Sequence, residues 1–238
     1  MAEHGRHLGA ALMTTPRPAA RARRAWLAGG SGLVGGELLR MLLADASYAS
    51  VISVGRRTLP LDDATDPKLV QAIVDFGDPS AFDALDPADC AFSCLGTTIK
   101  KAGSQEAFRA VDQDAVVAFA KAAKSNGAKV FVHVSSLGAD AHARSFYMLV
   151  KGQTEAAIEA LGFDSVYALR PSILDGERAE SRPFERVGLA FARALGPVLG
   201  KYRPTPASAV ARTMLAKAAA PEAGAHVVEA GAISAISD

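Results

Sequence analysis

The chain has 238 residues and a formal net charge of +1 at pH 7, and half of its residues are apolar. This length suits one large α/β domain, and the composition is that of a globular protein rather than a disordered, collagenous or disulfide-rich one. The near-neutral charge excludes the broad positive field that nucleic-acid binding requires, so we expect a small-molecule substrate and no nucleic-acid partner. No apolar run reaches the ~20 residues of a stable membrane span.

Residues 1–24 form a basic leader with five Arg and one Glu, and we exclude this segment from the fold. The rest of the chain holds 21 of the 26 basic and 24 of the 25 acidic side chains, so it is mildly acidic. The leader lacks the continuous apolar core of a secretory signal. We favour a disordered tail or an overlong start, with Met13 as an alternative initiator, over an organelle transit peptide. A cytoplasmic location is expected.

Over residues 25–238, short apolar or β-branched runs alternate with helical patterns, which predicts βαβ units. Strands are expected over residues 24–29, 51–54, 70–76, 90–95, 130–134, 165–169 and 225–229. Helices are expected over residues 33–45, 104–125, 144–161 and 206–219. These elements predict a single Rossmann domain, which is an α/β fold with a doubly wound parallel sheet.

After Pro171 the pattern loosens, because residues 172–204 hold three prolines and only short helical stretches. We expect a small C-terminal region that covers the substrate, not an independent domain. Within it, residues 187–195 are strongly apolar. We favour a helix packed on the core, and the alternatives are a lid over the substrate, a homodimer surface and a membrane-touching helix.

A glycine-rich turn follows the first expected strand and opens the first expected helix. Glycine permits a tight turn and lets backbone N–H groups approach a pyrophosphate, while the positive end of the helix dipole favours phosphate. The strand–turn–helix context predicts a dinucleotide site rather than a turn without a ligand. The expected cofactor contacts in this turn are Gly29, Ser31, Gly32, Leu33, Val34 and Gly35.

The end of the second expected strand discriminates between two cofactors. An NAD-binding protein usually presents an acidic residue here to the ribose 2′-hydroxyl. This chain has Arg56 and Arg57 instead, and guanidinium groups bind a 2′-phosphate through charge-assisted hydrogen bonds. We therefore predict that NADP(H) is preferred over NAD(H). The alternative is that both arginines are simply solvated.

Two further strand ends indicate where the adenosine part of the cofactor would lie. Asp75, after the third strand, can accept a hydrogen bond from the adenine amino group. Leu95 and Gly96, after the fourth strand, can line the adenine and the ribose. Ligands of open α/β sheets bind at such strand ends.

The cysteines and histidines do not indicate a metal site. Cys90 and Cys94 are four residues apart on one strand, too far for a disulfide if the strand is straight, and we expect two small buried hydrophobic side chains. No Cys/His cluster has the spacing of a zinc site. His133 and His142 are expected to be structural or solvated rather than catalytic.

Tyr147 and Lys151 lie four residues apart in the expected helix after the fifth strand, so they share one face of it. Tyr147 would protonate a carbonyl oxygen, or deprotonate an alcohol in the reverse direction. The charge of Lys151 would favour the phenolate, and its ammonium group would also hold the nicotinamide ribose. A serine would orient the carbonyl, and we favour Ser136 over Ser135 because only one of two adjacent strand residues faces the cleft. The alternative is a buried tyrosine beside a surface lysine.

With these motifs the chain resembles the short-chain dehydrogenase/reductase superfamily, and within it the atypical branch of Tat-interacting-protein-like oxidoreductases. The resemblance covers residues 25–220 and extends to residues 94–98, 101–103, 135–140, 163–164, 169–171 and 180–183. It implies a Rossmann fold, NADPH bound at the glycine turn and the arginine pair, and Tyr147 as the proton donor. It also implies that Leu174 and Arg182 lie near the nicotinamide and contact the cofactor.

The sequence leaves three functions open. We favour an NADPH-dependent oxidoreductase that acts on a small carbonyl or alcohol. The second function is a non-catalytic NADPH-binding regulator that acts through a protein partner, as the family resemblance allows. The third is sugar epimerase or dehydratase chemistry, for which the region after Pro171 is short.

Overall fold

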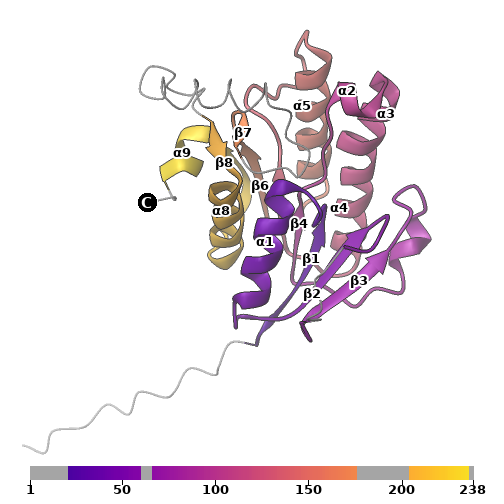
Figure 1. The fold of residues 1–238 in the computed structure, drawn as a ribbon, viewed down its shortest axis with the longest axis vertical. Helices are drawn as coiled ribbons and strands as arrows, with labels where there is room; N and C mark the ends of the chain where they lie inside the picture. Colours follow the sequence, from indigo (N-terminus) through magenta and orange to yellow (C-terminus); the bar gives the residue numbers. More distant parts are fainter. Residues whose placement is uncertain (1–20, 60–65, 176–203, 236–238) are drawn as a thin grey trace, which may run out of the picture.

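The computed structural model describes residues 21–59, 66–175 and 204–235, which form a parallel sheet with helices on both faces (Figure 1). The strand order is β3-β2-β1-β4-β5-β6-β9, and every pairing is parallel. The strands are β1 (Arg23–Ala28), β2 (Tyr48–Gly55), β3 (Leu69–Ile73), β4 (Cys90–Ser93), β5 (Val130–Val134), β6 (Ser165–Arg170) and β9 (Gly224–Glu229). The predicted doubly wound Rossmann fold is therefore confirmed.

Two pairs of helices cover the sheet. On one face α1 (Leu33–Ala44) lies beside α8 (Ala207–Ala219), and on the other α4 (Ala115–Ser125) lies beside α5 (Phe146–Glu159) (Figure 1). Shorter elements connect these layers: η1 (Pro79–Phe82), α2 (Ile99–Ala102), α3 (Gln105–Arg109), η2 (Ala110–Asp114), β7 (Leu174–Asp175), β8 (Thr205–Pro206) and α9 (Ala230–Ala235).

The central strand β1 shows why the sheet has two apolar cores. Its side chains alternate between the faces, so Ala25 and Leu27 join the core under α1 and α8, whereas Trp26 and Ala28 join the core under α4. All four are fully buried. A parallel strand covered on both faces reads as a continuous apolar run, which is the pattern from which this strand was predicted.

The long helix predicted over residues 104–125 is interrupted. The amide of Ala115 donates to the carbonyl of Ala110, five residues back, which makes η2 a π turn between α3 and α4. π turns are rare and occur mostly as single turns within α-helices, and the apolar pattern of the sequence predicted a continuous helix here. This turn contains Asp112, which belongs to the candidate site described below.

The sheet also begins earlier than the predicted boundary between leader and fold. Arg23 is the first residue of β1, and its guanidinium group donates to the carbonyl of Ala218 at 2.6 Å and lies 4.4 Å from the ring of Tyr48. These contacts bring the last two residues assigned to the leader into the sheet. Residues 1–20, most of the expected substrate-covering region 172–204, and the apolar segment 187–195 lie outside the described residues.

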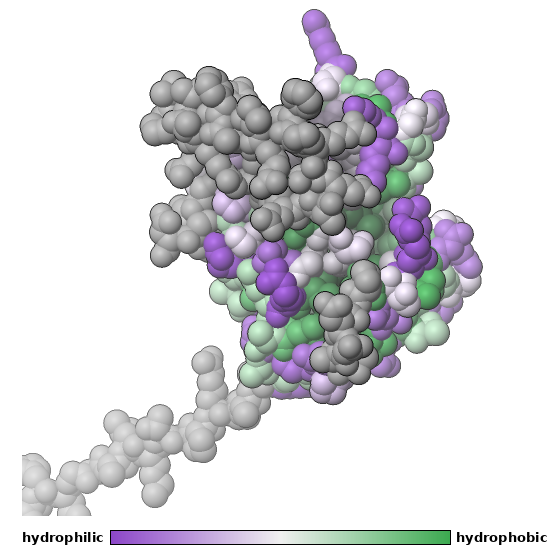
Figure 2. All heavy atoms as spheres, in the orientation of Figure 1, coloured by the Kyte–Doolittle hydropathy of each residue, from purple (hydrophilic) through white to green (hydrophobic). Residues whose placement is uncertain are grey.

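Both cysteines lie among the described residues. Cys90 and Cys94 are free thiols, and burial raises the pKa of the Cys90 thiol to about 12. No helix in the described ranges is long and apolar enough to cross a membrane. On the face shown in Figure 2, hydrophilic and hydrophobic side chains are interspersed over the described surface.

Candidate functional site

The candidate site lies where the carboxyl ends of β1 and β4 meet. β1 pairs with β2 on one side and with β4 on the other, so the chain connections diverge at this point. Ligands of open α/β sheets bind in the crevice outside such a switch point. All the predicted cofactor residues from Gly29 to Gly96 lie in segments that follow a strand of this sheet.

The glycine turn packs closely against backbone of the same chain, which residues without a Cβ allow. Gly29 has a φ of 84°, and a Cβ at this position would lie 2.6 Å from the backbone of Cys94 at the end of β4. A Cβ on Gly35 would lie 2.1 Å from the carbonyl oxygen of Gly29. Gly32 caps α1 without a side-chain hydrogen bond, so the amides of the first turn are left for an anion. The residues present therefore fit a dinucleotide pyrophosphate.

The ends of β2 and β3 lie on the β1–β2 side of the switch point. Arg56 and Arg57 follow Gly55, the last residue of β2, and both are exposed. No acidic residue occupies this position. Asp75 is exposed beyond β3, and its Oδ1 accepts from the amide of Gly77 at 2.9 Å.

The segment after β4 connects the expected adenosine site to α5. Leu95 packs against the core under α4, while Gly96 is exposed. A Cβ on Gly96 would lie 3.4 Å from Oδ1 of Asp112 and 3.8 Å from Nζ of Lys151. The predicted cofactor loop and the predicted catalytic lysine are therefore neighbours.

Helix α5 presents Tyr147 in its first turn and Lys151 one turn later. The ring of Tyr147 is half-buried, with its centroid 5.4 Å from that of Phe108, and its hydroxyl makes no hydrogen bond to the described part of the chain. Gly152 allows the loop before α5 to cross the helix, because a Cβ here would lie 2.1 Å from the carbonyl carbon of Asp140. A glycine costs a helix interior roughly 0.5–1 kcal/mol, so this close packing explains its presence.

Lys151 is buried and paired. Its Nζ lies 2.6 Å from Oδ1 of Asp112, and the two side chains are 7% and 0% exposed. The other carboxylate oxygen of Asp112 accepts from the amide of Thr97 at 2.8 Å. Lys151 is therefore not the surface lysine of the alternative interpretation.

Asp112 is the site residue that the sequence interpretation missed. The sequence does indicate this residue, because Asp112 stands at a spacing of four among the apolar Phe108, Val116 and Ala120. All four side chains are buried in the structure. An acidic residue in an apolar helical stripe needs a buried partner. The sequence shows the need but not the partner, which lies on another helix.

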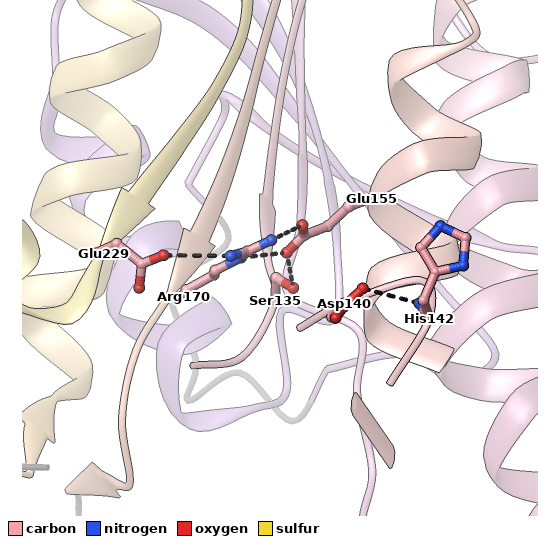
Figure 3. Close-up of polar contacts among 6 residues, drawn as sticks. All are labelled: Ser135, Asp140, His142, Glu155, Arg170 and Glu229. Atoms are coloured by element: carbon pink, nitrogen blue, oxygen red, sulfur yellow. Dashed lines mark hydrogen bonds and ion pairs between the residues drawn. The ribbon is translucent and has the colours of Figure 1, made fainter. Parts of the chain in front are cut away.

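The two candidate serines differ in their contacts (Figure 3). The hydroxyl of Ser135, which is buried, bonds to Glu155 of α5. Glu155 is held in turn by Arg170 of β6, through contacts of 2.6 Å and 3.0 Å. Ser136 is half-buried, and its side chain has no hydrogen bond to the described part of the chain. The preference for Ser136 as the serine that orients a carbonyl stays a prediction, and the engagement of Ser135 is consistent with it.

Arg170 extends this network to the edge of the sheet. It also contacts Glu229 of β9 at 3.3 Å (Figure 3). The hydrogen bonds that Arg170 donates to Glu155 raise the pKa of its guanidinium further above its already high value. The network therefore carries fixed charges that link α5, β6 and β9.

The two histidines occupy different environments. His133 on β5 is buried, and desolvation, followed by the charges of Lys151 and Arg170, lowers its pKa to about 3. It is therefore neutral at physiological pH. His142 is exposed, and its backbone amide donates to Asp140 at 2.9 Å (Figure 3). Within the described part of the chain, neither histidine makes a hydrogen bond or a ring contact with Tyr147.

The remaining predicted residues lie on the C-terminal side. Leu174 is on β7 and packs against the core under α1 and α8. Arg182 lies outside the described residues. Among the described residues, no group of three or more His, Cys, Asp or Glu side chains is arranged to hold a metal ion.

Three features define a Rossmann-type nucleotide-binding protein of the short-chain dehydrogenase/reductase class: the parallel sheet, the glycine turn at its switch point, and α5 with Tyr147 and Lys151. Residues 29–221 match a family model described as NAD(P)H-binding. The chain belongs to this NAD(P)H-binding family of atypical short-chain dehydrogenases/reductases.

Two relatives support this assignment. The chain is 36% identical to protein HTATIP2 of Rattus norvegicus over 203 residues, which are 84% of this chain and 82% of the relative. It is 38% identical to the mitochondrial protein fmp52 of Emericella nidulans over 177 residues, 72% of this chain and 76% of that protein. Among solved structures, the Bordetella bronchiseptica enzyme WbmH in complex with NAD+ aligns with a TM-score of 0.67 and 15% identity, covering 88% and 76% of the two chains. At this identity the likeness shows the fold alone.

Proposed function

We propose that this protein is an NADP(H)-dependent oxidoreductase that acts on a small carbonyl compound or the corresponding alcohol. The observation that carries the proposal is the position of Lys151. It is buried beside Gly96 of the loop after β4, one helical turn from Tyr147. A lysine and a tyrosine at the edge of a dinucleotide crevice are suited to moving a proton where a hydride is exchanged.

The residues that would hold the cofactor follow from the strand ends. The amides of Ser31, Leu33 and Val34 would bind the pyrophosphate at the N-terminus of α1, whereas the amide of Gly32 donates to the carbonyl of Gly29. Arg56 and Arg57 would bind the 2′-phosphate. Asp75, Leu95 and Gly96 would surround the adenosine, and Leu174 and Arg182 would lie toward the nicotinamide.

The chain's own groups would then manage the proton. NADPH, when bound, supplies the hydride. Tyr147 would donate its phenolic proton to the carbonyl oxygen, or take a proton from an alcohol in the reverse direction. Ser136 would hold the same oxygen by a hydrogen bond, and Lys151 would favour the phenolate that remains on Tyr147.

Replacing Tyr147 by Phe tests this mechanism. The change removes the proton donor and keeps the ring that packs on Phe108. We expect NADPH consumption with a responsive carbonyl compound, found in a broad panel, to fall by roughly 10²–10⁴-fold. NADPH binding, measured by fluorescence titration, should change little. Tyr167→Phe is the control, because Tyr167 lies in the core and bonds to Glu222.

Unchanged turnover in Tyr147→Phe would exclude the mechanism. Tight NADPH binding without turnover of any compound in the panel would instead support a regulator that acts through a protein partner.

The cofactor preference has a separate test. Replacing Arg56 and Arg57 together by Ala should weaken NADPH binding by roughly 10–100-fold and leave NADH binding nearly unchanged, because only the 2′-phosphate is affected. Arg40→Ala is the matched control, since Arg40 is an exposed arginine of α1 paired with Glu37. Equal losses for both cofactors would contradict the assignment of the 2′-phosphate to this pair.

A cytoplasmic location is part of the proposal, and the two free thiols are consistent with a reducing compartment. The fungal relatives are named mitochondrial. Fractionation of cells that express the full chain distinguishes the two locations.

A further inference from the structure

We propose that Gln71 of β3 is a positioning residue that holds the loop carrying Arg56 and Arg57, and that it thereby strengthens the preference for NADP(H) over NAD(H). Residues 56–59, which directly follow β2, are called the arginine loop below. The proposal rests on the proposed function for the place of the 2′-phosphate. The contacts that carry it lie within the chain, so one part of the test needs no cofactor.

The first end of the arginine loop is fixed by the sheet. Gly55 is the last residue of β2, and its carbonyl oxygen accepts a hydrogen bond from the amide of Val74 at 2.9 Å. Val74 follows the edge strand β3 directly and is buried. The point at which the loop leaves the sheet is therefore tied to the end of β3.

The other end of the arginine loop is held by Gln71. Its Oε1 accepts from the amide of Leu59 at 2.7 Å, in partly buried surroundings. Because a backbone amide can only donate, the atom of Gln71 that bonds to it is the carbonyl oxygen. The hydrogen bond joins residues 12 positions apart in the sequence and holds the loop against the edge strand.

The alternation of β3 explains why Gln71 reaches the loop. Side chains two apart on a strand lie on one face. Leu69 packs against the core under α1 and α8, and Leu59 packs against the same core, so Gln71 shares the face on which the loop lies. In the register of the sheet, Gln71 pairs with Ser53 of β2. A shift of β3 by one residue would bring an apolar side chain to this place, and it could not accept the hydrogen bond.

Leu59 also connects the arginine loop to the glycine turn. A Cβ on Gly30 would lie 3.3 Å from Cδ1 of Leu59, so this side chain lies directly beside the turn. The amide of Leu59 is held by Gln71 at the same time. The loop that would bind the 2′-phosphate is thereby fixed relative to the turn that would bind the pyrophosphate.

The arginines themselves do not fix the loop. Arg56 and Arg57 are exposed, and neither side chain makes a hydrogen bond or an ion pair within the described ranges. A loop that must be ordered when a ligand binds weakens the binding, whereas a loop already held in place does not. NADPH would use both guanidinium groups, but NADH has no 2′-phosphate for them. A tether on this loop therefore favours NADPH selectively.

The tether is tested first in the cofactor-free full chain. Gln71→Met keeps a long side chain and removes the acceptor, so hydrogen exchange at the Leu59 amide should accelerate by roughly 3–10-fold. Gln71→Glu keeps an acceptor oxygen and should restore the slow exchange. Ile73→Met is the matched control, because Ile73 lies on the same face of β3 and is 63% exposed. Unchanged exchange in Gln71→Met would refute the tether.

The effect on the cofactor is measured by fluorescence titration with NADPH and with NADH. In Gln71→Met, NADPH binding should weaken by roughly 3–10-fold, and NADH binding by less than about twofold. Ile73→Met should change neither. Equal losses for the two cofactors, or an unchanged affinity for NADPH, would overturn the proposal. If Gln71→Met does not fold, Gln71→Thr repeats both measurements, since threonine suits a strand and its hydroxyl is too short to replace Oε1.

A double-mutant cycle shows whether Gln71 acts through the arginines. Once Arg56 and Arg57 are both replaced by Ala, adding Gln71→Met should not weaken NADPH binding further. A further loss of the same size would overturn the proposal, because Gln71 would then act on another part of the site. If the Arg56/Arg57 variant alone bound NADPH as tightly as the natural chain, the proposed place of the 2′-phosphate would fail, while exchange at the Leu59 amide would still report on the tether.

Discussion

Two ion pairs project from α5 one helical turn apart, and they differ in access to water. Lys151 and Asp112 are 7% and 0% exposed, and each group has few partners. Arg170 and Glu155 are 20% and 12% exposed, and Arg170 also reaches Glu229, which is 53% exposed. The first pair is closed by its surroundings, whereas the second is part of an open network. Figure 3 shows the contacts of Arg170 with Glu155 and Glu229 in this network.

The difference indicates two uses of charge in one helix. A closed pair is fixed in position, and the loss of one charge leaves the other buried, because water cannot replace it. An open network can lose one member and keep the rest solvated. The closed pair therefore suits a lysine whose position must be kept beside the cofactor loop. The open network suits the fixation of β5, β6 and β9 around the helix.

The largest expected effect comes from breaking the closed pair. Lys151→Met leaves the Asp112 carboxylate buried without its partner, and we expect the free energy of unfolding to fall by roughly 3–5 kcal/mol. The double variant with Asp112→Asn should recover most of this loss. Denaturant unfolding of both variants measures the effect. Lys217→Met is the control, since its pair with Glu222 is open to solvent.

A loss below about 1 kcal/mol in Lys151→Met would contradict this description, because it would match the value of a solvated pair.

The buried His133 interacts electrostatically with Lys151 of the closed pair and with Arg170 of the open network, and it makes stability depend on pH. Its folded pKa of about 3 is below the ordinary value of 6.5, mainly because of burial. Stability from the neutral ring is thus present above pH 6.5 and is lost as pH falls toward 3. At pH 4 the loss attributable to this group is about 3 kcal/mol.

Replacing His133 by Leu should remove this contribution. The difference in unfolding free energy between the natural chain and the His133→Leu variant should change with pH between 6.5 and 4. The exposed His142→Leu variant should show no such trend relative to the natural chain. A parallel pH dependence in all three proteins would show that His133 is accessible to protons in the folded state.

Much of the fold could be predicted from the sequence because it depends on local repetition. The buried run of β1 follows from its continuous apolar sequence, and the glycine turn after it follows from backbone geometry. The expected helix over residues 144–161 is observed as Phe146–Glu159. These features require no knowledge of distant residues.

The features that the sequence did not reveal depend on contacts between distant segments. Asp112 and Lys151 form an ion pair although they are 39 positions apart in the sequence. Asp112 also lies in the π turn, which the apolar pattern of the sequence did not predict. Gly152 likewise became interpretable only when Asp140 was found against it. An acidic residue within an apolar stripe is the one sequence signal that could have indicated this part of the site.

A smaller effect is expected from the core of the open network. Glu155→Gln removes the charge that holds Arg170 through two hydrogen bonds, and it also changes the acceptor of Ser135. Because Arg170 keeps Glu229 and some access to water, the loss in unfolding free energy should be about 2 kcal/mol. Denaturant unfolding measures it. A loss as large as that of Lys151→Met would show that the two pairs are equally closed.

The smallest effect is expected at the exposed end of the same network. Glu229 is more than half exposed and its contact with Arg170 is 3.3 Å long, so Glu229→Gln should change the unfolding free energy by less than about 0.5 kcal/mol. Added salt should reduce even this difference, since water and ions already screen the pair. An effect that exceeds about 1 kcal/mol and resists salt would mean that β9 depends on Glu229 for its pairing with β6, and the network would then be closed at its outer end as well.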